Sequence, residues 1–291
     1  MSAAGTAGAG DLPGATATVA ALLAEARARG VERLDAQRLL AHVLERPRSW
    51  LIAHDDAPLA APTTERLRTL IGRRADGEPL AYLLGNHEFH GLALDVTEAV
   101  LVPRADTEVL VDWALELLLA GPLGGLAAPR VADLGTGSGA IALAVKHRQP
   151  AAQLTATDVS AAALDVARAN AARLGIDVVF AAGAWWQALE GRCFDLVLSN
   201  PPYIAGDDTH LPALRHEPRI ALTPGGDGLG ALREIVGGAP AHLERGGWLL
   251  LEHGFDQADA VQTLLRLHGF GDVATRPDLA GRPRCSGGRR R

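Results

Sequence analysis

Residues 131–139 read Val-Ala-Asp-Leu-Gly-Thr-Gly-Ser-Gly, an apolar strand that runs into a glycine-rich loop, and an apolar helical segment follows from Ala140. Glycine permits a tight turn and lets a ligand approach the backbone without meeting a Cβ atom. Asp158 ends the next predicted strand, where a carboxylate can accept hydrogen bonds from both hydroxyls of a ribose. This order of strand, loop, helix and acid predicts a site for an adenosine nucleoside at the carboxyl end of a parallel sheet.

The loop by itself does not select the cofactor. Gly135, Gly137 and Ala140 also satisfy the dinucleotide fingerprint, whose last position can be alanine. A nicotinamide-dependent dehydrogenase therefore stays open at this point. A purely structural turn is disfavoured because the strand, the helix and the following acid are all in place.

Strand-like and helical segments alternate along this half of the chain. Strands are predicted at 131–134, 154–157, 178–180, 194–198 and 247–251, with another near Val273, and helices at 107–119, 140–145, 161–174, 231–243 and 258–267. Gly237, Gly238 and Pro240 weaken the expectation of an unbroken helix at 231–243. Such alternation is typical of a mostly parallel sheet covered by helices on both faces, so the predicted fold class is α/β with a Rossmann-like sheet.

The N-terminal part has a different character. Residues 1–14 are rich in Gly and Ala and are predicted to be a disordered tail. Helical spacing of apolar residues predicts helices at 16–29, at 35–44 with Asp35 as N-cap, and at 63–73. We expect an all-helical domain at 15–82, a hairpin connector around Gly91 at 83–103, and a catalytic domain at 104–291.

A second informative stretch, residues 194–203, reads Phe-Asp-Leu-Val-Leu-Ser-Asn-Pro-Pro-Tyr. Proline cannot donate a hydrogen bond to a sheet, so Pro201 and Pro202 end the apolar strand and hold the chain rigidly at its carboxyl end. This places Asn200 and Tyr203 at the mouth of the crevice in which parallel sheets bind their ligands.

These residue types suit a planar amide or amine nitrogen, whose lone pair is delocalised and which must be oriented rather than deprotonated. The Asn200 side-chain oxygen and the Pro201 carbonyl can each accept one hydrogen of an NH₂ group and turn its lone pair toward a sulfonium methyl. Both acceptors also stabilise the positive charge that develops on nitrogen. Tyr203 can stack on the flat group and keep out water. The motif predicts methyl transfer to nitrogen from S-adenosyl-L-methionine.

Composition limits the remaining classes of protein. Of 291 residues, 48% are hydrophobic and 21% charged, which permits a large buried core, and the net charge of −6 disfavours a protein built to bind a nucleic-acid backbone. Neither a bilayer-spanning run nor a signal peptide is evident, so no membrane is expected and the predicted location is cytoplasmic. Cys193 and Cys285 predict neither a disulfide framework nor a metal site, and residues 287–291 are expected to be a frayed, solvated tail.

The chain resembles the HemK-type protein-(glutamine-N5) methyltransferases that modify peptide chain release factors. Besides the two motifs above, the resemblance covers nearly the whole chain and rests on Tyr82, Gly85, Glu88-Phe89, Pro103-Arg104-Ala105-Asp106-Thr107-Glu108, Glu217-Pro218, Asp227-Gly228-Leu229 and Glu252-His253-Gly254. It implies a helical N-terminal domain that helps to hold the release factor, and a catalytic domain that uses S-adenosyl-L-methionine to methylate the glutamine of its Gly-Gly-Gln loop.

The resemblance also assigns residues by position. The cofactor site would comprise Gly135, Thr136, Gly137, Ser138, Gly139, Asp158, Trp185 and Asn200, and the glutamine would be held by Asn200, Pro201, Pro202 and Tyr203. Trp185 would form an apolar wall beside the adenine. Ala105 departs from the family, which usually has a second proline there, and this loosens only the entrance to the helix. His253 has no role in this mechanism and is expected to be a hydrogen-bonded structural residue.

Three other functions stay open. An adenine-N6 methyltransferase of DNA or RNA would use the same four residues on the same kind of NH₂ group, but the acidic balance and the lack of an evident basic domain disfavour it, and no direct contact with nucleic acid is expected. Glutamine methylation of a ribosomal protein, as in a sister family, is the second. A catalytically idle adaptor that only binds cofactor is the third, and the intact motif at residues 200–203 disfavours it.

Overall fold

The computed structural model describes residues 17–291 and divides the chain into two compact units, Met1–Leu84 and Gly85–Arg291. The disordered tail predicted at residues 1–14 lies outside the described residues. Each unit has an apolar core of its own, and the hairpin predicted as a connector belongs to the second unit.

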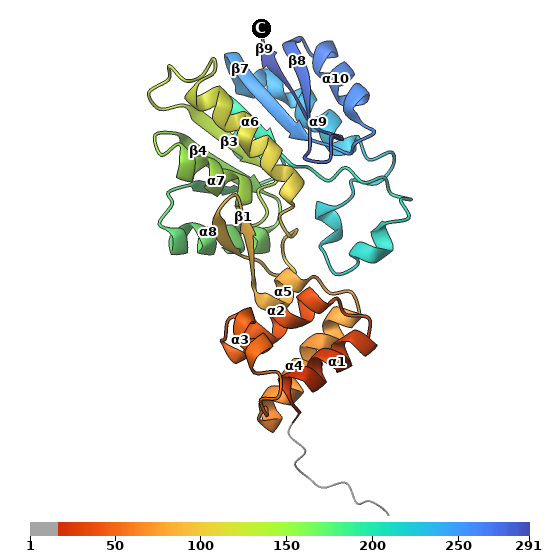
Figure 1. Ribbon diagram of the computed structural model, residues 1–291. Coiled ribbons are helices and arrows are strands. Elements are labelled where there is room, and N and C mark those ends of the chain that lie inside the picture. Colours follow the sequence, from red (N-terminus) through yellow and green to blue (C-terminus); the bar gives the residue numbers. More distant parts are fainter. Residues whose placement is uncertain (1–16) are drawn as a thin grey trace, which may run out of the picture. The chain divides into compact units, whose positions relative to one another are not determined.

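The described part of the first unit is helical, as the sequence predicts (Figure 1). Its helices are α1 (Val19–Ala28), α2 (Arg33–Leu44), α3 (Arg48–Ala53), α4 (Ala61–Ala75) and α5 (Leu80–Leu84). Sequence patterning found the three longest and missed α3 and α5, which have 6 and 5 residues and so are too short to show an apolar period. Asp35 is not an N-cap: α2 begins at Arg33, and the Asp35 carboxylate accepts a hydrogen bond from Arg74 Nε at 2.7 Å.

The second unit is built on one mixed sheet with the strand order β5-β4-β3-β6-β7-β9-β8. Its strands are β3 (Arg130–Leu134), β4 (Gln153–Asp158), β5 (Val179–Ala182), β6 (Phe194–Ser199), β7 (Leu243–Glu252), β8 (Phe270–Pro277) and β9 (Pro283–Arg290). The strands from β5 to β7 are parallel, whereas β9 runs antiparallel to both of its neighbours, β7 and β8. The central strands β3 and β6 are almost wholly buried because both of their faces are covered.

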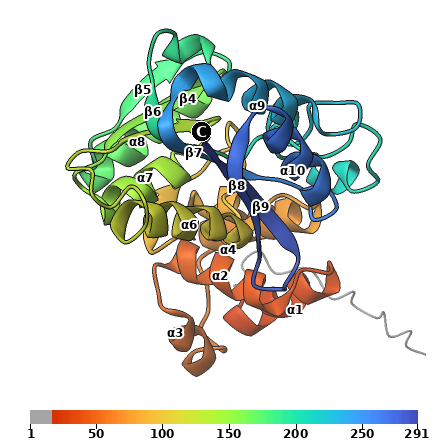
Figure 2. The same cartoon turned by 90° about the horizontal axis from the view of Figure 1, so that it is seen from above.

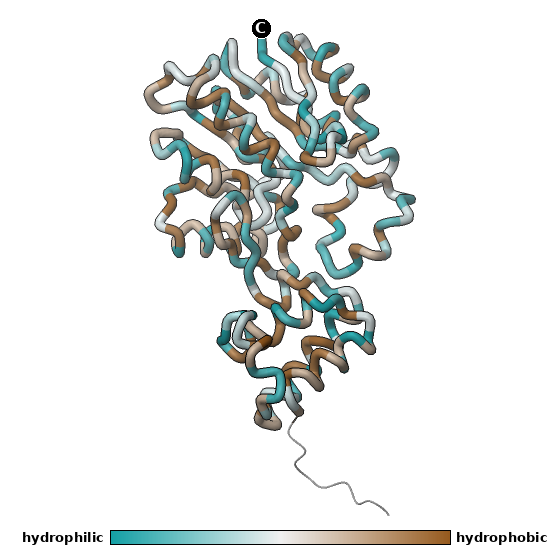
Figure 3. Tube along the Cα trace, in the orientation of Figure 1, coloured by the Kyte–Doolittle hydropathy of each residue, from teal (hydrophilic) through white to brown (hydrophobic). Residues whose placement is uncertain are grey.

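Helices cover both faces of this sheet (Figures 1 and 2). One face carries α6 (Glu108–Leu119), α7 (Ala140–Arg148) and α8 (Ala161–Leu174), and the other carries α9 (Gly230–His242) and α10 (Ala258–Leu267). Figure 3 shows that apolar residues follow the central strands, whereas the outer helix surfaces are more polar. Helix α9 continues through Pro240, which lies in its last turn. The predicted α/β fold with a Rossmann-like sheet is confirmed.

The C-terminal segment corrects a prediction. Residues 287–291 are expected from the sequence to be a frayed tail, but residues 283–290 form β9, which pairs with β7 on one side and β8 on the other. Gly287 is buried, and a Cβ atom there would overlap the Leu250 side chain and lie 2.8 Å from the Leu249 carbonyl oxygen. The glycines that suggested a loose end are therefore there because this part of the sheet has no room for side chains.

The predicted hairpin around Gly91 consists of β1 (Asn86–Phe89) and β2 (Leu92–Asp95), and it packs on α8. The buried Asn170 of α8 accepts a hydrogen bond from the Asp95 N–H at 2.7 Å and donates to the Asp95 and Ser138 carbonyls, each at 3.0 Å. One side chain thus ties the hairpin to the glycine-rich loop. Across residues 17–291, no helix combines the length and apolarity that crossing a membrane requires.

Candidate active site

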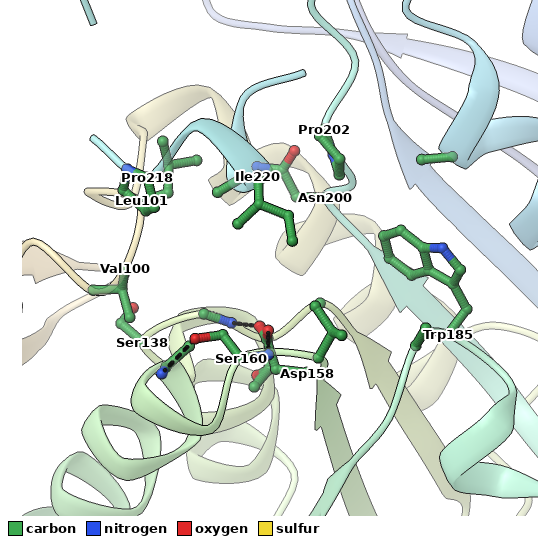
Figure 4. A pocket seen from close by; sticks show the side chains of 18 of the residues that line it. Val100, Leu101, Ser138, Asp158, Ser160, Trp185, Asn200, Pro202, Pro218 and Ile220 are labelled. Atoms are coloured by element: carbon green, nitrogen blue, oxygen red, sulfur yellow. Dashed lines mark hydrogen bonds between the residues drawn. The ribbon is translucent and has the colours of Figure 1, made fainter. Parts of the chain in front are cut away.

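A cavity of about 680 Å³ opens at the carboxyl ends of the parallel strands in the second unit (Figure 4). It brings together most of the residues that the sequence nominated: Gly135, Thr136, Gly137, Ser138, Asp158, Trp185, Asn200 and Pro202. Asn200 and Pro202 border it on the side opposite Asp158 and Ser160, and the Trp185 indole closes its flank (Figure 4). Two motifs that are far apart in the sequence therefore share one cavity.

Three nominated residues are not among those that line the cavity: Gly139, Pro201 and Tyr203. Gly139 has a positive φ of 85°, and a Cβ atom on it would lie 3.0 Å from Leu143 and 3.3 Å from Ala167. Its glycine is needed for close packing of α7 and α8 rather than for room around a ligand.

Buried polar contacts with β3 and β4 hold the glycine-rich loop in place. The N–H groups of Gly135 and Thr136 both donate to the Thr157 carbonyl at 2.9 Å. The fully buried Asp133 accepts from the Thr136 hydroxyl at 2.6 Å and from the Ala142 N–H at 3.2 Å. Desolvation raises the pKa of Asp133 to about 7, against the opposing effect of these two hydrogen bonds. The loop is thus a fixed element and not a mobile turn.

Asp158 lies at the end of β4 and faces both the loop and the cavity. One carboxylate oxygen accepts from the Gly137 N–H at 2.9 Å, and the other accepts from the Ser160 N–H at 2.9 Å. Because a carboxylate has about four lone-pair sites, these bonds leave capacity for the hydroxyls of a bound sugar. Ser160 in turn caps α8 by accepting from the Ala163 N–H at 3.2 Å.

The two adjacent tryptophans have different surroundings. Trp185 lines the cavity, and its ring carbon Cζ3 would lie 3.3 Å from a Cβ atom on Gly135. Its φ of +44° is in the left-handed region, which a bulky side chain rarely adopts. Trp186 instead donates from Nε1 to the Ile235 carbonyl at 3.2 Å and stacks on His242. Trp186 is therefore a packing residue, and Trp185 is the one available to a ligand.

Asn200 follows β6 and turns its carboxamide toward the cavity. Its Nδ2 donates to the Thr107 hydroxyl oxygen at 3.1 Å, and this contact leaves the amide oxygen for a donor from elsewhere. Thr107 itself is buried and borders the same cavity. Thr107 is identified from the sequence only as the start of a predicted helix and as part of the stretch at 103–108 that carries the resemblance, and its side chain does not cap α6.

Tyr203 is held in place by hydrogen bonds at its hydroxyl and at its carbonyl. Its hydroxyl donates to Glu252 Oε1 at 3.1 Å, and its carbonyl accepts from Gln257 Nε2 at 2.9 Å. Burial, together with the neighbouring Glu252, raises the pKa of Tyr203, so the hydroxyl keeps its proton. Desolvation also raises the pKa of the fully buried Glu252 to about 7.

Two further residues of the stretches that carry the resemblance, Glu217 and His253, are buried but are not among those that line the cavity. Glu217 is buried, accepts from the Val102 N–H at 3.1 Å and forms an ion pair with Arg104, so it fixes the segment at 99–103 that borders the cavity. His253 is buried and hydrogen-bonded to the Gly254 carbonyl at 2.8 Å and to the Ser286 hydroxyl at 2.7 Å. These contacts fit the structural role expected of His253.

Sequence comparison places the chain among known proteins. The profile of the methyltransferase small domain matches residues 108–229, and that of the PrmC N-terminal domain matches residues 15–85. A protein of Xylella fastidiosa named release factor glutamine methyltransferase is 54% identical over 92% of this chain and 97% of its own length. A protein of the same name from Bordetella pertussis is 53% identical over 89% of this chain and 95% of its own length.

The chain belongs to the release factor glutamine methyltransferase family. The resemblance seen in the sequence is thereby confirmed. Family and fold together make the chain an S-adenosyl-L-methionine-dependent methyltransferase, as the sequence predicted. The roles of its individual site residues remain predictions.

Solved structures agree with this fold at low sequence identity. The catalytic domain of hMettl16 in complex with a 3′UTR hairpin is 17% identical, with a TM-score of 0.54 over 78% of this chain and 81% of that one. A methyltransferase from Pyrococcus furiosus is 19% identical, with a TM-score of 0.50 over 68% of this chain and 88% of that one. These similarities concern the fold alone.

Proposed function

We propose that this protein transfers the methyl group of S-adenosyl-L-methionine to the side-chain amide nitrogen of the glutamine in the Gly-Gly-Gln loop of peptide chain release factors. The observation that carries the proposal is the Asn200 carboxamide. Asn200 lines the cavity that the glycine-rich loop also lines, and its NH₂ group is bound to Thr107, which leaves its oxygen to accept from a substrate. An acceptor in that position suits a substrate amide.

The residues of the cavity fit the cofactor. A volume of about 680 Å³ is in the usual range for a small-molecule site. Gly137 has a φ of +55° and open space where a Cβ atom would lie, so its bare backbone can face a ligand. We infer that Asp158 accepts hydrogen bonds from the ribose hydroxyls and that Trp185 packs against the adenine. When bound, S-adenosyl-L-methionine supplies an electrophilic methyl group on a positively charged sulfur.

The protein side of the reaction is orientation. The Asn200 oxygen and the Pro201 carbonyl would each accept one amide hydrogen, which directs the nitrogen lone pair along the line of attack and stabilises the charge that develops on nitrogen. The nitrogen forms a bond to the methyl carbon as the bond from that carbon to sulfur breaks. The methylated nitrogen is then strongly acidic and loses a proton to water, so no general base is required.

The names of the relatives bear on which molecule accepts the methyl group. Their printed name is release factor glutamine methyltransferase, which favours a release factor over the ribosomal protein and the nucleic-acid adenine that the sequence left open. We further infer that the helical unit helps to hold the release factor. A substrate that works in translation would also place the enzyme in the cytoplasm.

The test is incubation of the full-length protein with isotope-labelled S-adenosyl-L-methionine and a purified release factor, followed by mass spectrometry of the tryptic peptides. We expect one added methyl group on the glutamine of the Gly-Gly-Gln loop. A release factor with Gly-Gly-Ala in the loop is the matched control and should stay unlabelled. Equal labelling of the control, or labelling of only a ribosomal protein or an oligonucleotide, would disprove the proposed acceptor.

A further inference from the structure

Thr107 occupies a helix-cap position without acting as a cap. It precedes α6 and is the last residue of the 3₁₀ turn η1 (Ala105–Thr107), where a threonine hydroxyl ordinarily accepts a hydrogen bond from an N–H group of the first helical turn. Its side chain makes no such bond. Thr107 is buried, with 3% of its surface exposed, and its hydroxyl oxygen accepts a hydrogen bond from Asn200 Nδ2 at 3.1 Å. Thr107 has helical backbone angles, with φ of −68° and ψ of −19°, so its hydroxyl is not used to cap α6 and is available to Asn200.

The other neighbour of this hydroxyl is Glu252, at the end of β7. The Thr107 hydroxyl interacts with the Glu252 carboxyl group, which also accepts from the Tyr203 hydroxyl at 3.1 Å. Glu252 is 0% exposed, so water does not compete for these contacts. Thr107, which contacts the Asn200 side chain, and Tyr203, which ends the Asn200 motif, therefore share the Glu252 carboxyl group.

The direction of the hydrogen bonds follows from counting protons. A hydroxyl has one proton, and the Glu252 carboxylate, once ionised above its pKa of about 7, can only accept. If the Thr107 proton points to Glu252, the Thr107 oxygen can only accept, and the group that it accepts from must be the Asn200 NH₂. The amide oxygen of Asn200, a residue that lines the cavity, is then left to accept from the substrate. The reverse rotamer of Asn200 would face the substrate NH₂ with another NH₂, which cannot accept its hydrogens.

We propose that Thr107 is a positioning residue that sets the orientation of the Asn200 carboxamide, and that Glu252 orients the Thr107 hydroxyl for this purpose. The inference rests on the proposed function, because it concerns how the acceptor for a substrate amide is held. Thr107 borders the cavity, but its hydroxyl is engaged by Asn200 and Glu252, so we infer that it acts on the substrate through Asn200.

The experiment compares Thr107→Val, which keeps the shape and removes the hydroxyl, with Thr107→Ser, which keeps the hydroxyl. For Thr107→Val we expect kcat for release-factor methylation to fall about 10- to 100-fold, because a misdirected reactant group costs about this much. KM for the release factor and Kd for S-adenosyl-L-methionine should change by less than about threefold. Thr107→Ser should recover most of the wild-type kcat.

Two controls separate orientation from general damage. Thr64→Val removes another buried threonine hydroxyl, one without a hydrogen-bond partner among the described residues, and should leave kcat unchanged. In an Asn200→Ala background there is no carboxamide to orient, so Thr107→Val should cost nothing further, a non-additivity that a purely structural role does not produce.

The outcomes are decisive in both directions. A normal kcat for Thr107→Val, a Thr107→Ser variant as slow as Thr107→Val, or the same loss in the wild-type and Asn200→Ala backgrounds would each overturn the inference. Wild-type enzyme that left the release factor unmethylated would instead overturn the proposed function, and this inference with it.

Discussion

Asn200 is the residue on which the proposed chemistry depends most directly. Asn200→Ala removes one of two acceptors for the substrate amide, so we expect the rate of methyl transfer to fall about 10²–10³-fold, by analogy with the loss of one oxyanion-hole donor. Cofactor affinity should fall much less. Asn200→Asp keeps an acceptor oxygen and should retain more activity, with a pH dependence that follows the new carboxylate. Single-turnover methylation of a release factor measures both variants, and near-normal transfer by Asn200→Ala would contradict the mechanism.

Asp158 has two partners besides the proposed ribose. Asp158→Ala should weaken binding of S-adenosyl-L-methionine by about 1.5–3 kcal/mol, the range for a lost hydrogen bond to a charged group. Because its carboxylate also accepts from the Gly137 and Ser160 N–H groups, part of this loss would come from a less ordered loop. Titration calorimetry measures the affinity, and far-ultraviolet circular dichroism checks the fold. Unchanged affinity would remove Asp158 from the site.

The sequence could nominate residues whose type and neighbours reveal their chemistry, such as Asn200 and Asp158. It could not reveal Glu252 as the partner of Tyr203 and Thr107, because their contact joins segments that are distant along the chain. It assigned Tyr203 to the substrate from its place in the motif at residues 200–203, without the contacts of its hydroxyl. A tyrosine ring can stack wherever its hydroxyl is satisfied, and only tertiary structure shows that Glu252 satisfies it here.

At the scale of elements, periodicity located the long helices and the central strands, since these are buried in a regular pattern. The boundaries of α8 and α10 coincide with the predicted ones. Strand β9 was missed because Cys285, Ser286, Gly287 and Gly288 are small residues with no apolar alternation. Their β structure is imposed by β7 and β8 on either side and not by their own propensity.

Crowding around β9 makes a prediction about stability. Gly287→Ala would place a methyl group against Leu250, the Leu249 carbonyl and Trp113, so we expect a loss of about 1–3 kcal/mol in the free energy of unfolding, typical of overpacking. Gly125→Ala is the matched control, because nothing lies within 4 Å of its added Cβ atom. Urea denaturation of both variants measures the difference. Equal stability of the two would show that the sheet can make room at Gly287.

At the scale of the whole molecule, two buried carboxyl groups couple stability to pH. Desolvation raises the pKa of Asp133 and of Glu252 to about 7, above the unfolded values of 3.8 and 4.5. The folded state therefore holds these protons more tightly than the unfolded state. Their contribution to stability is complete below the unfolded pKa and is lost as the pH rises toward 7.

Glu252→Gln isolates this effect because it cannot ionise. Relative to wild type, the variant should gain about 1–3 kcal/mol in the free energy of unfolding as the pH rises from about 5 to about 8, since only the wild type loses the contribution of Glu252. Urea denaturation at several pH values measures this difference. A constant difference between the two proteins would show that Glu252 titrates normally in the folded state.

The two units are predicted to have separate tasks. Residues 85–291 contain every residue that lines the cavity, so a chain lacking residues 1–84 should still bind S-adenosyl-L-methionine with wild-type affinity. Its methylation of an intact release factor should be severely reduced, because the helical unit that we expect to hold the protein substrate is gone. Calorimetry and a methylation assay test the two halves of the prediction. A truncated enzyme that is as fast as the full chain would refute the partner-holding role.

Trp185 has a strained backbone conformation at this site. A residue other than glycine held at a positive φ costs about 1–3 kcal/mol, and here the surrounding structure supplies that energy to keep a large aromatic ring beside Gly135. Glycine at position 185 would relieve this backbone cost, but it would also remove the ring that lines the cavity and packs against the core. Melting temperature alone would not report the loss of this wall, so screens at position 185 need to score turnover as well.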